Sequence, residues 1–367
     1  MKTEEFDYQL PEKLIAQRPL AQRDSSRLLV LHRESGLVEH RRFTDLGDYL
    51  KRGDILVANN SRVFPARLYG RKSTGGRVEF LLLERISAAR WKALVGGKRV
   101  REGVEIHLEK SDGALSGQIA TITAVLDGAV REIEIDTTAD ETLDGLGHVP
   151  LPPYIHEPLI DAERYQTIYS RPVGSAAAPT AGLHFTGDLL FDLRERGVIF
   201  ETCTLHVGLD TFKPVTADQV HRHTIHSEWA QLTPEAARRI NEAKLAGGRL
   251  VAVGTTAVRT LETGAVRSAG IVGSLQDISR SDAAGETSNI CPWKPVSAFE
   301  GKTDLFITPG YKYRAVNAII TNFHLPKSSL IMLVAAFGGQ EKLLATYKIA
   351  VEEQYRFYSF GDAMLIL

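Results

Sequence analysis

The segment at 177–186, AAPTAGLHFT, combines small uncharged residues with one imidazole and one phenyl ring. His184 can exchange a proton near neutral pH, and the ring of Phe185 offers a face on which a flat ligand can stack. Gly182 and the alanines allow the main chain to approach such a ligand, and Pro179 stiffens the loop. These residues indicate either the wall of a small-molecule pocket or a tight structural loop that buries its Phe.

Two further segments deliver polar side chains to the ends of predicted strands. LHVGLDTF contains His206 and Thr211, and TNFHLPKSSL contains Asn322 and His324. Ligand sites of α/β proteins gather where strands end and loops begin. Both segments are therefore candidates for a binding site, although a single strand-end histidine is more often structural. The second segment also suits an ordinary structural turn.

A third strand end leads directly into a predicted helix in VGTTAVRTLE. Gly254, Thr255 and Thr256 stand at the start of that helix, where free N–H groups suit a carboxylate or a phosphate. Arg259, about one turn further on, can pair with a carboxylate. The segment has neither the Walker nor the G-x-G-x-x-G spacing, so an ordinary helix cap is also consistent with it.

Three histidines and one glutamate fall within HRHTIHSEW at 221–229. His221, His223 and His226 lack the i,i+4 spacing of the HExxH zinc site, and no cysteine lies nearby. We therefore expect no metal here and interpret Glu228, beside His226, as one half of a general acid–base pair.

The composition is that of a globular protein with a large core: 43% of the 367 residues are hydrophobic and 24% are charged. A net charge of −1 means that any polyanion must bind at a local basic patch. Cys203 and Cys291 form neither a disulfide framework nor a four-cysteine zinc pattern, as is usual in a reducing cytosol. No signal peptide is evident, and the longest apolar run, 330–337, is shorter than the about 20 residues of a membrane span. We expect a cytoplasmic protein.

Short alternating strands separated by Gly and Asp turns fill the region 63–148, which predicts a small antiparallel barrel or sandwich. Around this region, strands alternate with capped helices, which predicts a largely parallel sheet covered by helices and of barrel-like character. We therefore expect an α/β catalytic domain, 1–62 and 149–367, with an inserted β-barrel domain. Residues 264–303 are rich in Gly, Ser and Ala and predict a mobile loop.

Basic residues gather near the N-terminus and in the predicted insert. Runs of charge are usually solvated faces. Against a nearly neutral total, however, one basic face can follow an RNA backbone. The candidates for tRNA binding are Arg62, Arg67, Arg71 and Lys72.

Together these segments make the chain resemble the S-adenosylmethionine:tRNA ribosyltransferase-isomerase family of queuosine biosynthesis. The matching segments follow the family order from near residue 6 to the C-terminus. They are FDYQLPEKLIAQRP, RDSSRLLVL, GDILVANNSRVFPARLYGRK, HVPLPPYI, YQTIYS, AAPTAGLHF, LHVGLDTF, HSEW, VAVGTTAVRTLE, PGYKY, TNFHLPKSSLIMLVAAFGG and YRFYSFGDAMLIL.

The resemblance implies a transferase-isomerase that acts on tRNA carrying 7-aminomethyl-7-deazaguanine at the wobble position. The ribosyl part of S-adenosylmethionine is transferred and rearranged, adenine and methionine leave, and epoxyqueuosine remains in the tRNA. S-adenosylmethionine is then a consumed co-substrate, and we expect no cofactor and a monomer. The family fold, an α/β domain of barrel-like character with an inserted β-barrel, agrees with the organisation described above. A non-catalytic RNA-binding module, a metal-dependent hydrolase and a methyltransferase are the alternatives.

The chemistry implied by the resemblance assigns roles to the segments described above. His184, His206 and Glu228 are the candidate proton-transfer groups, with base and acid left open, and VGTT with Arg259 holds the methionine carboxylate. A wall of low charge admits the cationic sulfonium, and Phe185 stacks on a base. The expected substrate-binding residues are Ala178, Pro179, Thr180, Gly182, Phe185, Thr211, Gly254, Thr255, Thr256, Arg259, Asn322 and His324.

Overall fold

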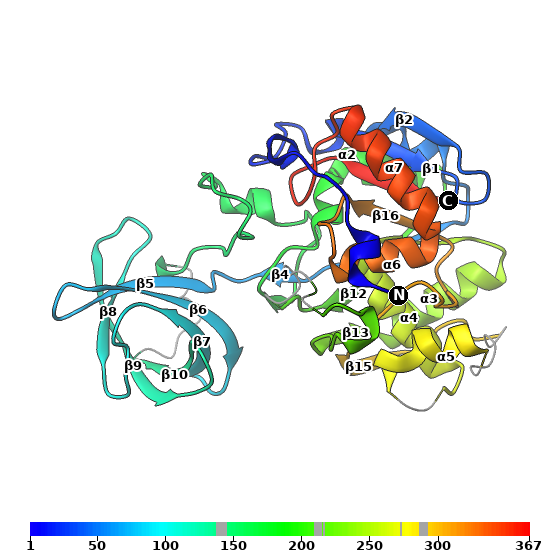
Figure 1. Cartoon of the computed structure of the whole chain (residues 1–367). Helices are drawn as coiled ribbons and strands as arrows, with labels where there is room; N and C mark the ends of the chain where they lie inside the picture. Colours follow the sequence, from blue (N-terminus) through cyan, green and yellow to red (C-terminus); the bar gives the residue numbers. More distant parts are fainter. Residues whose placement is uncertain (137–144, 209–214, 216, 272–273, 286–292) are drawn as a thin grey trace. The chain divides into compact units, whose positions relative to one another are not determined.

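The computed structural model describes residues 1–136, 145–208, 215, 217–271, 274–285 and 293–367, and Thr211 and Cys291 lie outside them. The chain divides into two compact units. The first comprises Met1–Arg62, Pro153–Pro172 and Ala178–Leu367, and the second Val63–Pro152 and Val173–Ala177. Figure 1 shows that the first unit is built from both ends of the chain and contains the helices labelled in the figure.

A nine-stranded sheet forms the centre of the first unit, in the order β15-β13-β12-β3-β14-β16-β17-β1-β2. Its strands β12, β3, β14 and β16 are parallel neighbours, and β17 is parallel to β1; the remaining pairs are antiparallel. The strands are β1 Arg27–Leu31, β2 Val38–Arg42, β3 Ile55–Asn59, β12 Ile199–Leu205, β13 Glu228–Leu232, β14 Leu250–Val253, β15 Phe299–Thr303, β16 Ala318–Asn322 and β17 Ala363–Ile366.

The central strands are apolar on both faces because both faces are covered. Every residue of β3 and β14 is buried, as expected for parallel strands between layers of helices. Alternate residues of the sheet, such as Leu56 and Val253, pack in one core cluster with Phe43 and with Leu189 of α2. Helices α3 and α4 contact β12 and β14 as well. This arrangement fixes the carboxyl ends of β14 and β16, where the candidate site lies.

Three of the helices begin at a side-chain cap that the sequence contains. Thr186, Thr233 and Ser328 accept hydrogen bonds from the first turns of α2, α3 and α6, respectively. Helix α4 is different because Gly254 precedes it and provides no side-chain cap. The helices are α2 Gly187–Glu195, α3 Pro234–Leu245, α4 Thr255–Ser268, α5 Ile278–Ala284, α6 Ser329–Gly338 and α7 Gln340–Glu352.

Six antiparallel strands close into a barrel in the second unit, in the order β10-β7-β6-β5-β8-β9. Inward residues such as Phe80, Leu108 and Ile133 are fully buried and form a core of their own. The strands are β5 Arg67–Lys72, β6 Arg77–Arg85, β7 Arg90–Gly96, β8 Glu105–Glu109, β9 Leu115–Val125 and β10 Val130–Ile135. A separate pair of short strands, β4 Arg62–Val63 and β11 Val173–Ser175, forms a two-stranded sheet.

The predicted class, an α/β protein with an antiparallel β-barrel, is confirmed. Closure belongs to the barrel alone: in the described part of the chain the large sheet is open, with β15 and β2 at its edges, and is mixed rather than largely parallel. The prediction of a single mobile loop at 264–303 is wrong for its described parts. Helix α4 continues to Ser268, α5 covers Ile278–Ala284, and β15 joins the sheet edge, because residues such as Ile278 and Phe299 are buried.

A buried carboxylate ties α4 to the chain that leads into β16. Glu262 is fully buried, and its two oxygens accept hydrogen bonds from Tyr311 Oη and from the main-chain N–H groups of residues 314–316, at 2.8–3.0 Å. The carboxylate thus accepts four hydrogen bonds, and three of them pair main-chain N–H groups that would otherwise be buried without a partner.

We expect Glu262→Gln to lower the free energy of unfolding by about 3 kcal/mol. The amide NH2 of the glutamine would face main-chain N–H groups and could not accept their hydrogen bonds. Glu242→Gln is the matched control: it breaks an exposed pair with Arg238 and should cost less than about 0.5 kcal/mol. Urea unfolding of both variants checks the difference. Equal stabilities would show that Glu262 does not hold this segment.

Candidate active site

A pocket lies in the first unit, where β14 and β16 end side by side, and holds about 680 Å³ of empty space that includes open solvent. Its wall contains the five residues predicted at the two strand ends, namely Gly254, Thr255, Thr256, Asn322 and His324. It also contains the predicted Ala178, Pro179 and Thr180. The lining residues are Tyr154, Ala178, Pro179, Thr180, Ala181, Val207, Gly254, Thr255, Thr256, Thr321, Asn322, Phe323, His324, Leu325, Ser328, Leu330, Tyr358 and Ser359.

The N-terminus of α4 forms one wall of this pocket. Gly254 adopts φ +87, and its N–H donates to the carbonyl oxygen of Ile320 at 2.7 Å, so the turn is fixed against β16. The helix has no side-chain cap, and Thr255 and Thr256 of its first turn line the pocket. The first N–H groups of a helix have no partner within the helix and carry its partial positive charge. This wall is therefore suited to an anionic group.

A chain of hydrogen bonds links the pocket wall to His184. Thr180 Oγ1 donates to Asn322 Oδ1 at 2.8 Å, so Asn322 Nδ2 faces His184 Nε2, at 3.2 Å. His184 Nε2 is then the acceptor, and Nδ1 carries the hydrogen and donates to Ser26 Oγ at 2.8 Å. Both ring nitrogens are thus occupied, in a fixed tautomer, by Ser26 directly before β1 on one side and by Asn322 at the end of β16 on the other.

Burial makes His184 a poor base. Its side chain is 5% exposed and stacks on Phe43, with ring centroids 5.0 Å apart. Burial, together with the positive charge of Arg356, lowers the pKa of His184 to about 3. Its ring lines a second, smaller cavity rather than the pocket at β14 and β16. The geometry favours His184 as a positioning residue for Asn322.

His324 lies in the pocket wall in a similarly neutral state. Its Nε2 is 2.7 Å from Thr321 Oγ1, and its main-chain N–H donates to Tyr347 Oη at 3.0 Å. Burial lowers the pKa of His324 to about 3. The pocket thus receives a polar but uncharged side chain at this position.

The pocket has an aromatic wall that the sequence analysis did not assign. Tyr154 and Tyr358 have ring centroids 4.7 Å apart, and Tyr154 Oη lies 2.8 Å from Ser359 Oγ. Tyr358 has φ +68, an uncommon conformation for a residue with a side chain. Both tyrosines belong to segments quoted above, YRFYSFGDAMLIL and HVPLPPYI, but no spacing within those segments indicates that they meet.

Two predicted binding residues belong to the core instead. Phe185 is fully buried and packs edge-on against Phe43 at 5.0 Å, so the structure does not support its predicted stacking role. At Gly182 an added Cβ would come within 2.1 Å of Tyr169 Oη. Gly182 is therefore required for close packing rather than for contact with a ligand.

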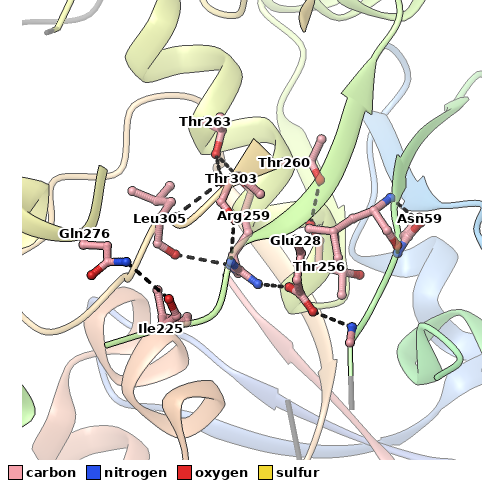
Figure 2. A network of polar contacts seen from close by, with 12 residues as sticks. Asn59, Ile225, Glu228, Thr256, Arg259, Thr260, Thr263, Gln276, Thr303 and Leu305 are labelled. Carbon is pink, nitrogen blue, oxygen red and sulfur yellow. Dashed lines mark hydrogen bonds and ion pairs between the residues drawn. The ribbon is translucent and has the colours of Figure 1, made fainter. Parts of the chain in front are cut away.

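Glu228 and Arg259 meet each other rather than the partners expected from the sequence. They form a buried ion pair, each residue 7% exposed, in which Arg259 Nη1 donates to Glu228 Oε2 (Figure 2). Arg259 Nε also donates to the carbonyl oxygen of Leu305 at 3.2 Å, and Glu228 Oε1 accepts from the N–H of Gly208 at 2.8 Å. Neither residue lines the pocket. The pair instead anchors the chain that leaves β12, immediately after Val207 in the pocket wall.

His206 is half-buried and directly precedes Val207. Its ring stacks on Trp229, with centroids 5.0 Å apart and planes 18° apart. Burial lowers the pKa of His206 below its usual value, so the imidazole is neutral near pH 7. Within the part of the chain that the structure describes, its Nδ1 has no hydrogen-bond partner. Of the three candidate proton-transfer groups, His206 is the one with a hydrogen-bonding atom that has no partner in the described ranges; this Nδ1 is buried, and His206 itself does not line the pocket.

The four candidate tRNA-binding cations are all engaged. Arg62 pairs with Glu163, Arg67 Nε lies 3.3 Å from Glu79 Oε1, and Arg71 Nε lies 2.6 Å from Glu109 Oε1. Lys72 donates to main-chain carbonyl oxygens of residues 98 and 99. Thr211 lies outside the described residues.

In the described ranges, no group of three or more His, Cys, Asp or Glu side chains converges as a metal site would require. His221, His223 and His226 form no such group either. No helix described by the structure is long and apolar enough to cross a membrane.

Glu228→Gln should leave the Arg259 charge buried without its counterion and lower the free energy of unfolding by about 3 kcal/mol. Adding Arg259→Met should recover part of that loss, because the two substitutions are coupled. Chemical denaturation of the three variants measures the coupling. A Glu228→Gln protein with wild-type stability but reduced turnover would return Glu228 to a direct proton-transfer role.

The buried neutral histidines predict a pH dependence of stability. The folded-state pKa of His324, about 3, lies below the 6.5 of an unfolded histidine, so its stabilising contribution is present above pH 6.5 and is lost as the pH falls. Between about pH 6 and 4, the free energy of unfolding should fall more steeply in the wild-type protein than in His324→Gln, by about 1.4 kcal/mol per pH unit. Urea unfolding at several pH values tests this, with exposed His156→Gln as the control. Identical slopes for His324→Gln and wild type would refute it.

Known proteins resemble this chain over its whole length. The family described as queuosine biosynthesis protein matches residues 3–366. S-adenosylmethionine:tRNA ribosyltransferase-isomerases of Desulforamulus reducens and Symbiobacterium thermophilum are each 50% identical to it, over 100% of both chains. The crystal structure of S-adenosylmethionine tRNA ribosyltransferase from Thermotoga maritima is 36% identical, with a TM-score of 0.52, and the match covers 99% of this chain and 100% of that one. The chain therefore belongs to the queuosine biosynthesis protein family.

Proposed function

We propose that this chain is an S-adenosylmethionine:tRNA ribosyltransferase-isomerase. It transfers the ribosyl part of S-adenosylmethionine to 7-aminomethyl-7-deazaguanine at the tRNA wobble position and isomerises it, giving epoxyqueuosine with release of adenine and methionine. The observation that supports this most is the pocket at β14 and β16, which combines a helix N-terminus, an aromatic pair and an uncharged wall. The full-length similarity to enzymes of that name favours it over a metal-dependent hydrolase or a non-catalytic RNA-binding module.

The co-substrate has an anionic end and a cationic centre, and the pocket offers a place for each. We assign its carboxylate to the N-terminus of α4, at Gly254, Thr255 and Thr256. The described lining residues include no Asp, Glu, Lys or Arg, so the sulfonium meets no fixed charge there. The rings of Tyr154 and Tyr358 can attract the sulfonium or stack on adenine, the role first expected of Phe185.

We assign the first proton transfer to His206. A sulfonium acidifies the adjacent ribose 5′ carbon, so a neutral imidazole can take a proton from it and leave the electron pair on carbon. Nδ1 of His206 is buried and has no hydrogen-bond partner in the described ranges, whereas both nitrogens of His184 are hydrogen-bonded, and His206 directly precedes Val207 of the pocket wall. Glu228 then acts through the loop after β12 as a positioning residue, with Arg259 as its counterion.

The remaining parts of the proposal concern the partners. We retain Arg62, Arg67, Arg71 and Lys72 as tRNA contacts, in which phosphates would replace their present partners. The enzyme would need no cofactor and would act as a cytoplasmic monomer. The target base must leave the anticodon stack to enter the pocket.

Product analysis tests the proposed reaction. The protein is mixed with S-adenosylmethionine and tRNA carrying 7-aminomethyl-7-deazaguanine, without added metal, and the digested tRNA is examined by mass spectrometry. We expect adenine and methionine in equal amounts and epoxyqueuosine in the tRNA. Release of S-adenosylhomocysteine, or tRNA binding without adenine release, would contradict the proposal.

His206→Gln should lower kcat by about 100-fold or more while leaving the Kd for S-adenosylmethionine nearly unchanged, because it removes the proton acceptor but not the pocket. His221→Gln, an exposed histidine of the same region, is the control and should retain wild-type kcat. A wild-type rate for a folded His206→Gln enzyme would remove His206 from the mechanism.

A further inference from the structure

A second cavity, with about 300 Å³ of empty space, adjoins the proposed substrate pocket. Ser359 lines both spaces, and His184 of the smaller cavity is hydrogen-bonded to Asn322 of the larger one. The wall of the smaller cavity is formed by Pro19, Leu20, Arg23, Ser26, Arg164, Leu183, His184, Arg356, Ser359, Phe360 and Gly361. Three arginine residues therefore line one small cavity beside the proposed reaction site.

Two of these guanidinium groups have only neutral partners among the described residues. Arg23 donates to the carbonyl oxygens of Gln166 and Glu163, at 2.6 and 2.8 Å. Arg164 donates to the carbonyl oxygens of Ala21, at 3.0 Å, and Leu20. Arg164 Nε is buried and has no hydrogen-bond partner in the described ranges. Main-chain carbonyls orient these two side chains but do not neutralise them.

The neighbouring carboxylates form their hydrogen bonds elsewhere, although the charges of Asp161 and Glu163 also reach Arg23. Arg356 alone has a counterion, Asp362, at 3.3 Å. The Glu163 carboxylate pairs with Arg62, and the Asp161 carboxylate accepts the N–H of Glu163. Asp24, next to Arg23 in the chain, accepts the hydroxyl of Thr186 at 2.6 Å and does not line the cavity.

Like charges are therefore held together at this cavity. Burial and the nearby charge of Arg164 lower the pKa of Arg23 more than the charges of Asp161 and Glu163 raise it, and the charges of Arg356 and Arg23 contribute to the low pKa of His184. Cations held close together at a buried site are stabilised when an anion binds between them. Planar guanidinium groups are the side chains best suited to bidentate binding of phosphate.

We propose that Arg23, Arg164 and Arg356 form a phosphate site that holds a phosphodiester of the tRNA next to the nucleotide whose base enters the substrate pocket. This inference rests on the proposed function for the identity of its ligand. A flipped nucleotide places its base in a pocket while its backbone stays outside, so an anion site sharing a wall with that pocket has the required position. The carboxylate of the co-substrate already has a site at the N-terminus of α4.

The test uses the full-length protein and the variants Arg23→Gln and Arg164→Gln. Each should weaken binding of the substrate tRNA at about 150 mM salt by about 10-fold or more and should reduce the slope of log K against log salt by roughly 0.7–0.9. The Kd for S-adenosylmethionine should stay unchanged. Arg194→Gln, an exposed arginine of α2, is the matched control and should leave the tRNA affinity within twofold of wild type.

Inorganic phosphate separates this proposal from the proposed function. Phosphate should raise the Tm of the wild-type protein, and the rise should be lost in both arginine variants, whether or not the protein acts on tRNA. Loss of S-adenosylmethionine binding with an unchanged tRNA salt slope would assign the cavity to the co-substrate carboxylate and overturn the proposal. Wild-type tRNA affinity and wild-type phosphate response in folded Arg164→Gln would also overturn it.

Discussion

The close pairing of β14 with β16 is the constraint on which the site depends. Because the two strands are parallel, their carboxyl ends meet at one edge of the sheet, and Gly254 at one end is hydrogen-bonded to Ile320 near the other. The positive φ of Gly254 turns the chain into α4 without a cap, so the helix N-terminus faces the pocket. Glu262 then ties the same helix to the segment before β16. The wall at the N-terminus of α4 and the polar wall at β16 are thus built as one unit.

Burial divides the titratable groups into those that support the site and those available to act in it. His184 has both nitrogens occupied, Glu228 has a buried counterion, and the low pKa of His324 keeps its ring uncharged. His206 is half-buried, its Nδ1 has no hydrogen-bond partner in the described ranges, and burial lowers its pKa, so its imidazole is neutral near pH 7. For this reason we propose His206 as the proton acceptor and the other candidates as positioning residues.

The sequence predicted those features that depend on local order along the chain. Strand β14 followed by Gly-Thr-Thr, and β16 followed by Phe-His-Leu-Pro, were predicted correctly from the order of residues along the chain. Because the two strands are parallel, their ends lie together. The Glu228–Arg259 pair was not predicted, since it joins β13 to α4 and no spacing links the two residues. The Tyr154–Tyr358 pair escaped prediction for the same reason. The role of Phe185 could not be decided from the sequence, because a phenyl ring suits ligand stacking and core packing equally; in the structure this ring is fully buried.

The most direct test of this account is a crystal structure with S-adenosylmethionine or a stable sulfonium analogue bound. The account predicts a carboxylate within hydrogen-bond distance of the N–H groups at the start of α4, with the sulfonium or adenine against Tyr154 and Tyr358. A ligand bound away from β14 and β16, or a carboxylate held by Arg23 and Arg164 instead, would contradict it.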